Sequence, residues 1–293
     1  MNVTKTPEKA KKRNGQFKEA WRRLRKSVTA MIGLVVLVIF ILLAVFADVI
    51  ADYDNVVIKM GRDRLARPSA EHLLGTDHLG RDIFARIVHG ARISMTIGLF
   101  VTFFAVIIGG FLGASTAYWG GIYDMIVMRL CDVMSSIPGV LMSLAIIAAL
   151  GPDMINLLIA LVITSIPVYT RFIRSTVLTI VEQDFIEAAK ACGTSDFRII
   201  TKHIVSNVVG PIIVQATQSI ASTILSASGL SFLGMGIQPP RPEWGAMLGD
   251  TREYLRTDPH LVIFPGVAIV LVALSLNLLG DGLRDALDPR LKT

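Results

Sequence analysis

Five polar side chains between residues 208 and 230 have the spacing of one wall of a helix. They are Gln215, Gln218, Ser219, Ser222 and Ser226, separated by 3, 1, 3 and 4 positions. At about 100° per residue these positions fall within an arc of about 100°. Amide and hydroxyl groups along such a wall can exchange hydrogen bonds with a hydrophilic solute. Serine also supports close helix packing in a membrane, so a pathway lining and a packing face are both open readings.

A second polar group lies between residues 74 and 88, where carboxylates and arginines alternate with glycine. Asp77, Arg81 and Asp82 are close enough in sequence to form local ion pairs, and no nucleophile accompanies them. Thr76 or Asp77 can cap a helix. The apolar residues of that helix share one face and are Ile83, Ile87 and Val88. We expect the helix to lie along the outer membrane surface before the chain re-enters the bilayer.

Metal and nucleotide motifs are absent from the sequence. His72, His78 and His89 share the outer segment, but none forms an i, i+4 pair and no cysteine accompanies them, so no metal site is predicted. The pattern G-x-x-x-x-G-K-[ST] does not occur, nor do H-E-x-x-H, C-x-x-C or G-x-S-x-G. We therefore expect no enzyme activity and no bound cofactor in this chain. If ATP drives the protein, another chain must bind it.

The composition is that of a membrane protein. Of 293 residues, 53% are hydrophobic and only 18% are charged, with a mean hydropathy of +0.60. Residues 30–47 form an uncharged run of eighteen, which nearly spans a bilayer core of about 30 Å. The run is too long for the apolar part of a signal peptide and is followed by Asp48-Val49-Ile50 without a small-residue cleavage site. A retained first transmembrane helix is predicted.

Hydrophobic runs predict an all-α protein with six transmembrane helices. The other five spans are expected at residues 93–118, 126–150, 154–172, 208–230 and 261–280. Ten lysines and arginines against two glutamates precede the first span, which places both termini in the cytoplasm. The net charge of +6 follows from this topology, and nucleic acid is not expected as a partner. Cys131 and Cys192 then lie near or within cytoplasmic segments, where reduced thiols are expected.

The predicted organisation follows from these spans. Residues 1–28 form a basic cytoplasmic tail, 29–50 the first transmembrane helix, and 51–92 an external segment with the interfacial helix. Residues 93–282 form a core of five helices, with a cytoplasmic loop at 175–207 and an external loop at 231–259. Residues 283–293 form a cytoplasmic tail.

The cytoplasmic loop has the shape of a docking element. Residues 187–193, with the sequence Glu-Ala-Ala-Lys-Ala-Cys-Gly, favour a short helix that stops at Gly193, since glycine takes the left-handed cap conformation. Thr194, Ser195 or Asp196 can cap a second helix that runs towards Asn207. Adjacent alanines have short side chains, so another protein can approach this face of the helix closely. Helices rich in alanine are also common in ordinary loops, so these residues alone leave both interpretations open.

This loop resembles the EAA loop of binding-protein-dependent ABC importer permeases. The likeness rests on Glu187-Ala188-Ala189, then Gly193, then His203-Ile204. In that family the loop forms a coupling helix in a cleft of the ATPase. The resemblance implies a type I permease fold and assigns ATPase coupling to Asp184, Glu187, Ala188, Ala189 and Gly193. The family usually has proline where this chain has Ser206, which leaves the end of the second loop helix undetermined.

Three further segments resemble the C-type permeases of dipeptide, oligopeptide and nickel importers. They are residues 74–82, 231–245 and 277–290. The resemblance implies a homologous B-type permease, two ABC ATPases that hold ATP and Mg²⁺, and an external solute-binding protein. It also implies a location in a bacterial or archaeal plasma membrane, in contact with lipid.

Peptide import by alternating access is the function that this resemblance favours. Nickel, glutathione and sugar-derived solutes compete with peptides, because specificity is expected mainly in the binding protein. An ion channel or membrane scaffold is the rival from a different class, and an intramembrane enzyme is disfavoured because no paired catalytic groups occur inside the spans.

Overall fold

The computed structural model describes residues 14–56 and 63–287, which are helical without a β-strand in those ranges. The helices are α1 (Asn14–Leu24), α2 (Val28–Val45), α3 (Ala47–Ile50), η1 (Tyr53–Asn55), α4 (Ile83–Trp119), α5 (Gly121–Ser135), α6 (Gly139–Leu150), α7 (Met154–Val181), α8 (Asp184–Ala191), α9 (Asp196–Arg198), the π-helical η2 (Ile199–Ile204), α10 (Val205–Phe232), α11 (Trp244–Thr251), η3 (Arg252–Tyr254) and α12 (His260–Leu287).

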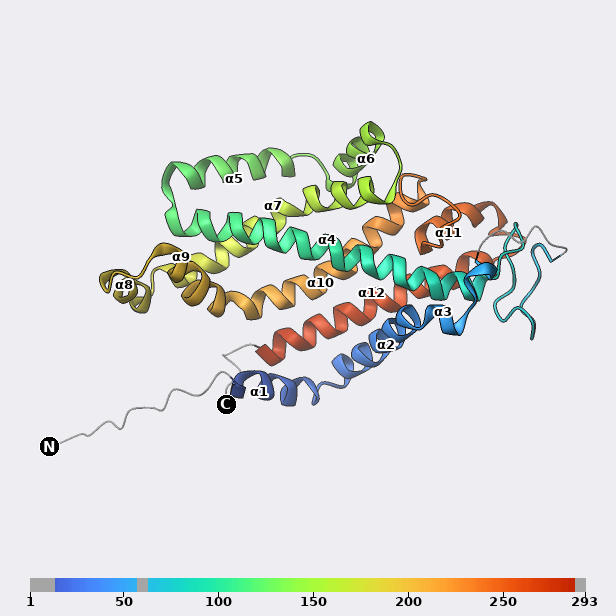
Figure 1. Ribbon diagram of the computed structural model, residues 1–293, viewed down its shortest axis with the longest axis horizontal. Helices are drawn as coiled ribbons and strands as arrows, with labels where there is room; N and C mark the ends of the chain where they lie inside the picture. Colours follow the sequence, from blue (N-terminus) through green and yellow to red (C-terminus); the bar gives the residue numbers. More distant parts are fainter. Residues whose placement is uncertain (1–13, 57–62, 288–293) are drawn as a thin grey trace.

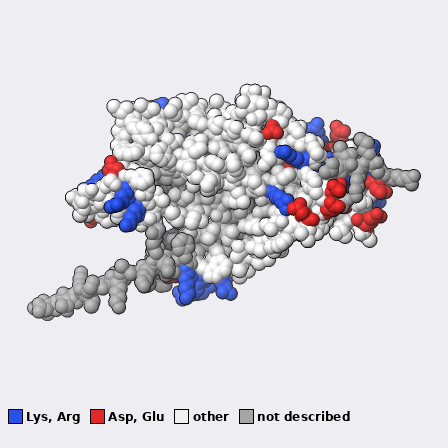
Figure 2. Space-filling model, viewed as in Figure 1, with Lys and Arg blue, Asp and Glu red and all other residues white. Residues whose placement is uncertain are grey.

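Five helices are long and apolar enough to cross a membrane. They are α2, α4, α7, the continuous helix over residues 196–232, and α12. Helices α5 and α6 together form a sixth candidate span, bent by 84°. Figure 2 shows charged side chains gathered towards the two ends of the molecule, with a band almost free of charge between them. The prediction of an all-α membrane protein is confirmed.

The long helices lie side by side, with the short elements at opposite ends of the bundle (Figure 1). Helix α4 packs against α7 and α10, and α12 packs against α10 and α2. Helices α8 and α9 lie at one end, and α11 lies at the other. Close approach between α4 and α7 depends on glycine, because a Cβ on Gly113 would lie 2.5 Å from the backbone oxygen of Thr170. Gly109 and Gly113 follow the small-xxx-small spacing and both lie at this contact, which is how small residues let helix backbones approach in a membrane.

The predicted interfacial helix is wrong. Residues from Ile83 onward are the first turns of α4, which continues unbroken to Trp119. The N-cap is Asp82 rather than Thr76 or Asp77, and its carboxylate accepts a hydrogen bond from the Ala85 N–H at 2.8 Å. The polar residues in these turns are covered by protein rather than by headgroups. They include Arg86 and His89, which are both buried.

The predicted third span is not one continuous helix. Residues 136–138 separate α5 from α6, and Pro138 is the N-cap of α6. Proline has no N–H to continue the α5 hydrogen-bond pattern, and it disfavours helical geometry at the preceding residue. The chain therefore turns sharply at this point.

The second loop helix does not end near Asn207. It begins after Ser195, passes through η2 and continues into α10, so residues 196–232 form one helix. Ser206 keeps the backbone N–H that proline would lack, and no boundary is imposed there. Helix α12 likewise extends past the predicted end at residue 280 to Leu287. Of the predicted tails at residues 1–28 and 283–293, residues 14–24 form α1 and residues 283–287 end α12, while residues 1–13 and 288–293 lie outside the described residues.

Candidate functional site

Residues 184–198, called the hairpin below, form helix, turn and helix as predicted. Helix α8 ends at Ala191, and Gly193 has a φ of +74°, the left-handed conformation that favours glycine. The Gly193 N–H donates to the Lys190 oxygen at 2.9 Å, and the Thr194 N–H donates to the Ala189 oxygen at 3.1 Å. These bonds satisfy carbonyls at the end of α8. The prediction that the helix stops at Gly193 is confirmed.

One side of the hairpin is anchored in the protein and the other faces outward. Ile186 is fully buried and belongs to an apolar cluster with Ile173, Ile199 and Ile204. The predicted coupling residues lie on the other side: Asp184, Glu187, Ala188 and Gly193 are exposed, and Ala189 is half-buried.

The exposed side of the hairpin also carries an aromatic residue that the sequence reading missed. Phe197 is 78% exposed on α9, beside the turn. The signal in the sequence was an apolar residue in a charged segment that no membrane span accounts for. Phe197 adds a large apolar side chain to the exposed side of the hairpin, and aromatic residues are enriched among those that contribute most to binding energy at protein interfaces.

The polar wall on α10 is divided between two environments. Ser222 and Ser226 line a cavity of about 250 Å³ between α6, α7 and α10. Gln215 and Gln218 do not line this cavity. The Gln215 amide donates to the Ser219 hydroxyl at 3.3 Å, and the Gln218 amide donates to the Asp281 carboxylate of α12 at 3.0 Å. The structure therefore brings together only part of the predicted pathway.

The cavity lining is neutral and rich in hydroxyl groups. Its residues are Gly139, Val140, Ser143, Leu161, Thr164, Ser165, Ser222, Thr223, Ser226 and Leu230. The hydroxyls of Ser165 and Ser222 donate to backbone oxygens of their own helices at 2.7 and 3.0 Å, and Thr164 does the same at 3.0 Å. Because those protons are engaged, the Ser165 and Ser222 oxygens can accept, while the Thr164 oxygen also lies 3.4 Å from the Ser143 hydroxyl. The cavity thus suits a solute that donates hydrogen bonds.

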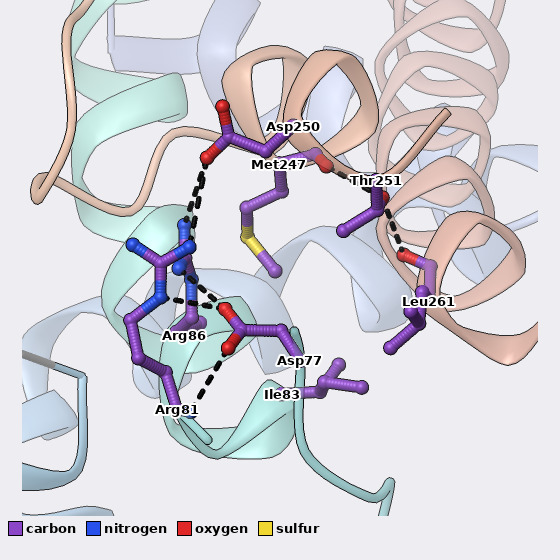
Figure 3. Close-up of a pocket in the computed structure, with 8 residues that line it drawn as sticks. All are labelled: Asp77, Arg81, Ile83, Arg86, Met247, Asp250, Thr251 and Leu261. Atoms are coloured by element: carbon purple, nitrogen blue, oxygen red, sulfur yellow. Dashed lines mark hydrogen bonds and ion pairs between the residues drawn. The ribbon is translucent and has the colours of Figure 1, made fainter. Parts of the chain in front are cut away.

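A buried ion cluster occupies the α11 end of the molecule (Figure 3). The Asp77 carboxylate accepts hydrogen bonds from Arg81 Nε at 2.6 Å and Arg86 Nη1 at 2.8 Å. Asp250 of α11 lies 3.6 Å from Arg81 and 4.0 Å from Arg86. The cavity beside them measures about 10 Å³, which is too small for a solute. The predicted ion pair between Asp77 and Arg81 is confirmed, whereas Asp82 caps α4 and lies beside His72. Asp250 links the cluster to α11, and Arg86 links it to α4.

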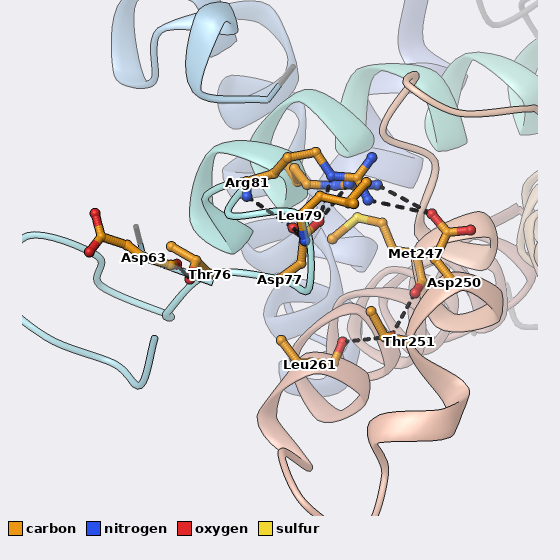
Figure 4. A network of polar contacts seen from close by, with 10 residues as sticks. Asp63, Thr76, Asp77, Leu79, Arg81, Met247, Asp250, Thr251 and Leu261 are labelled. Atoms are coloured by element: carbon orange, nitrogen blue, oxygen red, sulfur yellow. Dashed lines mark hydrogen bonds and ion pairs between the residues drawn. The ribbon is translucent and has the colours of Figure 1, made fainter. Parts of the chain in front are cut away.

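The segment before α4 is held by the same cluster (Figure 4). The Thr76 hydroxyl donates to the Asp63 backbone oxygen and accepts from the Ala66 N–H. Asp77 also accepts from the backbone N–H groups of Leu79 and Arg81, each at 2.9 Å. These bonds hold the segment before α4 in place, so its polar residues have a structural role.

Glu243 is a buried carboxyl that the sequence reading did not identify. It caps α11 by accepting from the N–H groups of Gly245 at 2.9 Å and Ala246 at 2.8 Å. The hydroxyls of Ser94 and Ser228 lie 3.3 and 3.4 Å from the same carboxylate. Burial raises the pKa of Glu243 above its ordinary value, and the backbone bonds act in the opposite direction. The residue joins α4, α10 and α11 at one point.

The three histidines of the outer segment have separate partners. His72 Nδ1 lies 2.9 Å from Asp82, His78 stacks on Tyr254, and His89 Nε2 lies 2.8 Å from the Ala51 oxygen. Within residues 14–56 and 63–287, no three metal-ligating side chains come together.

Comparisons with known proteins agree with this geometry. The model of the binding-protein-dependent transport system inner membrane component family matches residues 105–293, and that of the N-terminal TM domain of oligopeptide transport permease C matches residues 15–68. A dipeptide transport system permease protein of Alkalihalophilus pseudofirmus is 46% identical over 94% of this chain and 91% of its own. A glutathione transport system permease protein of Escherichia coli is 45% identical over 94% of this chain and 90% of its own.

A solved structure shares the fold. A chain of the MetNI methionine ABC transporter, seen in inward-facing conformations, superposes with a TM-score of 0.56 at 18% identity. The match covers 69% of this chain and 96% of that chain. At this identity the likeness concerns the fold alone.

Proposed function

Because this chain belongs to the binding-protein-dependent transport system inner membrane component family, and is an inner-membrane permease of an ABC importer, we propose that it translocates di- or oligopeptides. The observation that carries this proposal is the cavity between α6, α7 and α10, in which the Ser165 and Ser222 oxygens can accept hydrogen bonds. Peptides carry amide N–H groups and an ammonium group that can donate to such oxygens. The dipeptide permease of similar sequence supports the same choice.

Other solutes are ranked by the same chemistry. Glutathione also donates amide and ammonium hydrogens, and a glutathione permease is similar in sequence, so it is the second candidate. Nickel is bound best by imidazole, thiolate and carboxylate groups, and none of these is among the residues that line the cavity.

An ion channel or a membrane scaffold would not bind an ATPase. Purifying the intact complex and testing whether it contains an ATPase therefore distinguishes both alternatives from an importer.

The proposed mechanism is alternating access. This chain pairs with a homologous permease, and two ABC ATPases bind ATP and Mg²⁺ on the cytoplasmic side, where both termini and the hairpin lie. A solute-binding protein delivers the peptide to the opposite side. Closure of the ATPases moves the hairpin and the helices attached to it. The cavity then opens to the other side of the membrane.

Charge reversal at Glu187 tests the hairpin as the ATPase contact. Glu187→Lys is expected to lower both the amount of ATPase that purifies with the chain and the stimulated rate of ATP hydrolysis by about tenfold. Gly193→Val is expected to act in the same direction, because a β-branched residue does not tolerate a φ of +74°. Glu182→Lys is the matched control, since Glu182 is exposed but precedes the hairpin. Unchanged association and hydrolysis in Glu187→Lys would contradict the contact.

Cysteine labelling tests the cavity as part of the pathway. Single cysteines at Ser222 and Ser226, in a chain with both native cysteines replaced by serine, are expected to react with a membrane-impermeant thiol reagent. ATP with vanadate is expected to change their rates of reaction. Leu225→Cys is the control, because Leu225 is 48% exposed but does not line the cavity. Equal protection of positions 222 and 226 in every state would instead indicate helix packing.

A further inference from the structure

We propose that Tyr118 is the positioning residue that joins the hairpin to α4, so that movement of the hairpin is carried along α4 to the segment around Glu243. This inference rests on the proposed coupling role of the hairpin. It adds the side chain that transmits the movement and the part of the molecule that receives it.

Tyr118 contacts both sides of the hairpin turn. Its hydroxyl donates to the Asp196 carboxylate at 2.6 Å, and Lys190 Nζ lies 4.9 Å from the centre of its ring. Lys190 belongs to α8 and Asp196 to α9, so the Tyr118 side chain contacts the helices on both sides of Gly193. A hydrogen bond to a carboxylate is directional and stronger than one between neutral groups. The apolar packing of Ile186 gives no such direction.

Tyr118 lies at the end of a helix that can carry a displacement. Helix α4 has 37 residues and is about 55 Å long, and Tyr118 is next to its last residue. Gly120 and Gly121 follow, each with a φ of +61°, where the chain turns into α5. Near this end, α4 is held against α7 by the close contact at Gly113. We therefore expect a shift at Tyr118 to move α4 together with α7.

The other end of α4 is joined to α11 by hydrogen bonds, as the Tyr118 end is joined to the hairpin. The Trp244 indole N–H donates to the Ile87 backbone oxygen at 3.1 Å, and the Ser94 hydroxyl lies 3.3 Å from the Glu243 carboxylate. A Cβ on Gly90 would lie 2.8 Å from the Trp244 ring, so the two elements are in close contact. Figure 1 shows α4 running from the hairpin end to the α11 end of the bundle. One helix thus connects the proposed ATPase contact with the opposite side of the membrane.

The test uses the complex purified with its ATPase and permease partners in lipid nanodiscs. An Arg241→Cys label site is introduced beside Glu243, in a chain with Cys131 and Cys192 replaced by serine. Its rate of maleimide labelling is measured with and without ATP and vanadate. Tyr118→Phe keeps the ring over which Lys190 lies and removes only the hydroxyl. We expect it to retain the ATPase partners and to reduce the ATP-dependent change at position 241 by about tenfold.

Tyr123→Phe is the matched control, because the Tyr123 hydroxyl lies 3.0 Å from Ser115 and, in the part of the chain that the structure describes, forms no hydrogen bond with the hairpin. It is expected to behave like the parent chain. Asp196→Ala, which removes the acceptor, is expected to reproduce the effect of Tyr118→Phe, and the double variant is expected to be no worse than either single variant. A normal response in Tyr118→Phe, additive effects in the double variant, or no response at position 241 in the parent chain would overturn the inference. Failure of the parent chain to bind any ATPase would instead refute the proposed function.

Discussion

Replacing Asp77 with alanine is expected to lower the free energy of unfolding by about 3–5 kcal/mol, because two buried guanidinium groups lose their nearest counter-charge. The Arg81 and Arg86 side chains are 1% and 2% exposed and approach the Asp77 carboxylate to 2.6 and 2.8 Å. Asp250 would remain as a single, more distant carboxylate facing two cations. The thermal unfolding midpoint of the purified protein in detergent measures the effect.

Two further variants make this expectation specific to the buried charge. Asp48→Ala removes an exposed carboxylate that pairs with Arg92 at 2.9 Å, and it is expected to leave the unfolding midpoint unchanged. Asp77→Ala combined with Arg81→Leu leaves Arg86 opposite Asp250, so part of the lost stability should return. Equal midpoints for Asp77→Ala and Asp48→Ala would show that the cluster does not hold α4 to α11.

Gly113→Ala is expected to have the second large effect, a loss of about 1–3 kcal/mol of stability from overpacking between α4 and α7. The added Cβ would lie 2.5 Å from the Thr170 oxygen and 2.9 Å from the Arg174 nitrogen. Both are backbone atoms, so no side-chain rotation can relieve the contact and the helices must separate. We expect a lower unfolding midpoint and a smaller ATP-dependent response at the labelled cysteines, since α4 and α7 would no longer move together.

Gly229→Ala is the matched control for this change. Gly229 lies inside α10, and a Cβ there would have no neighbour within 4 Å. Alanine favours helix over glycine by about 0.5–1 kcal/mol, so this variant is expected to be neutral or slightly more stable. If both variants lower the midpoint equally, close approach at Gly113 is not what holds α4 to α7.

The sequence by itself determined the features that depend on neighbouring residues. Apolar runs long enough to cross a bilayer located five of the six predicted spans, and the alanine-rich run before Gly193 predicted α8 and its end. The small-xxx-small spacing of Gly109 and Gly113 is likewise a local feature, and it lies at the contact between α4 and α7. Hydropathy, helix propensity and glycine at a cap act within one or two turns of chain, so they can be read from the order of residues.

Where the polar residues point was decided only by the tertiary structure. The polar wall of α10 looked uniform, yet Ser226 faces a cavity while Gln218 reaches Asp281, 63 positions away. Helix periodicity places these residues on one face, but the neighbouring helix decides what that face meets. The residues from Ile83 had the pattern of a surface helix, but they form the first turns of α4 and contact α11, where the Trp244 indole N–H donates to the Ile87 oxygen.

The contacts of Tyr118 and Glu243 depend most completely on the folded chain. Tyr118 meets Asp196 across 78 positions, and Glu243 meets Ser94 across 149. No local preference marks either residue, because each is stabilised by a partner that only helix packing brings near. The apolar spans and the hairpin could thus be predicted from the amino-acid sequence. The route that connects them exists only once α4 lies between the hairpin and α11, since hydrogen bonds form between atoms that are close in space, however far apart they are along the chain.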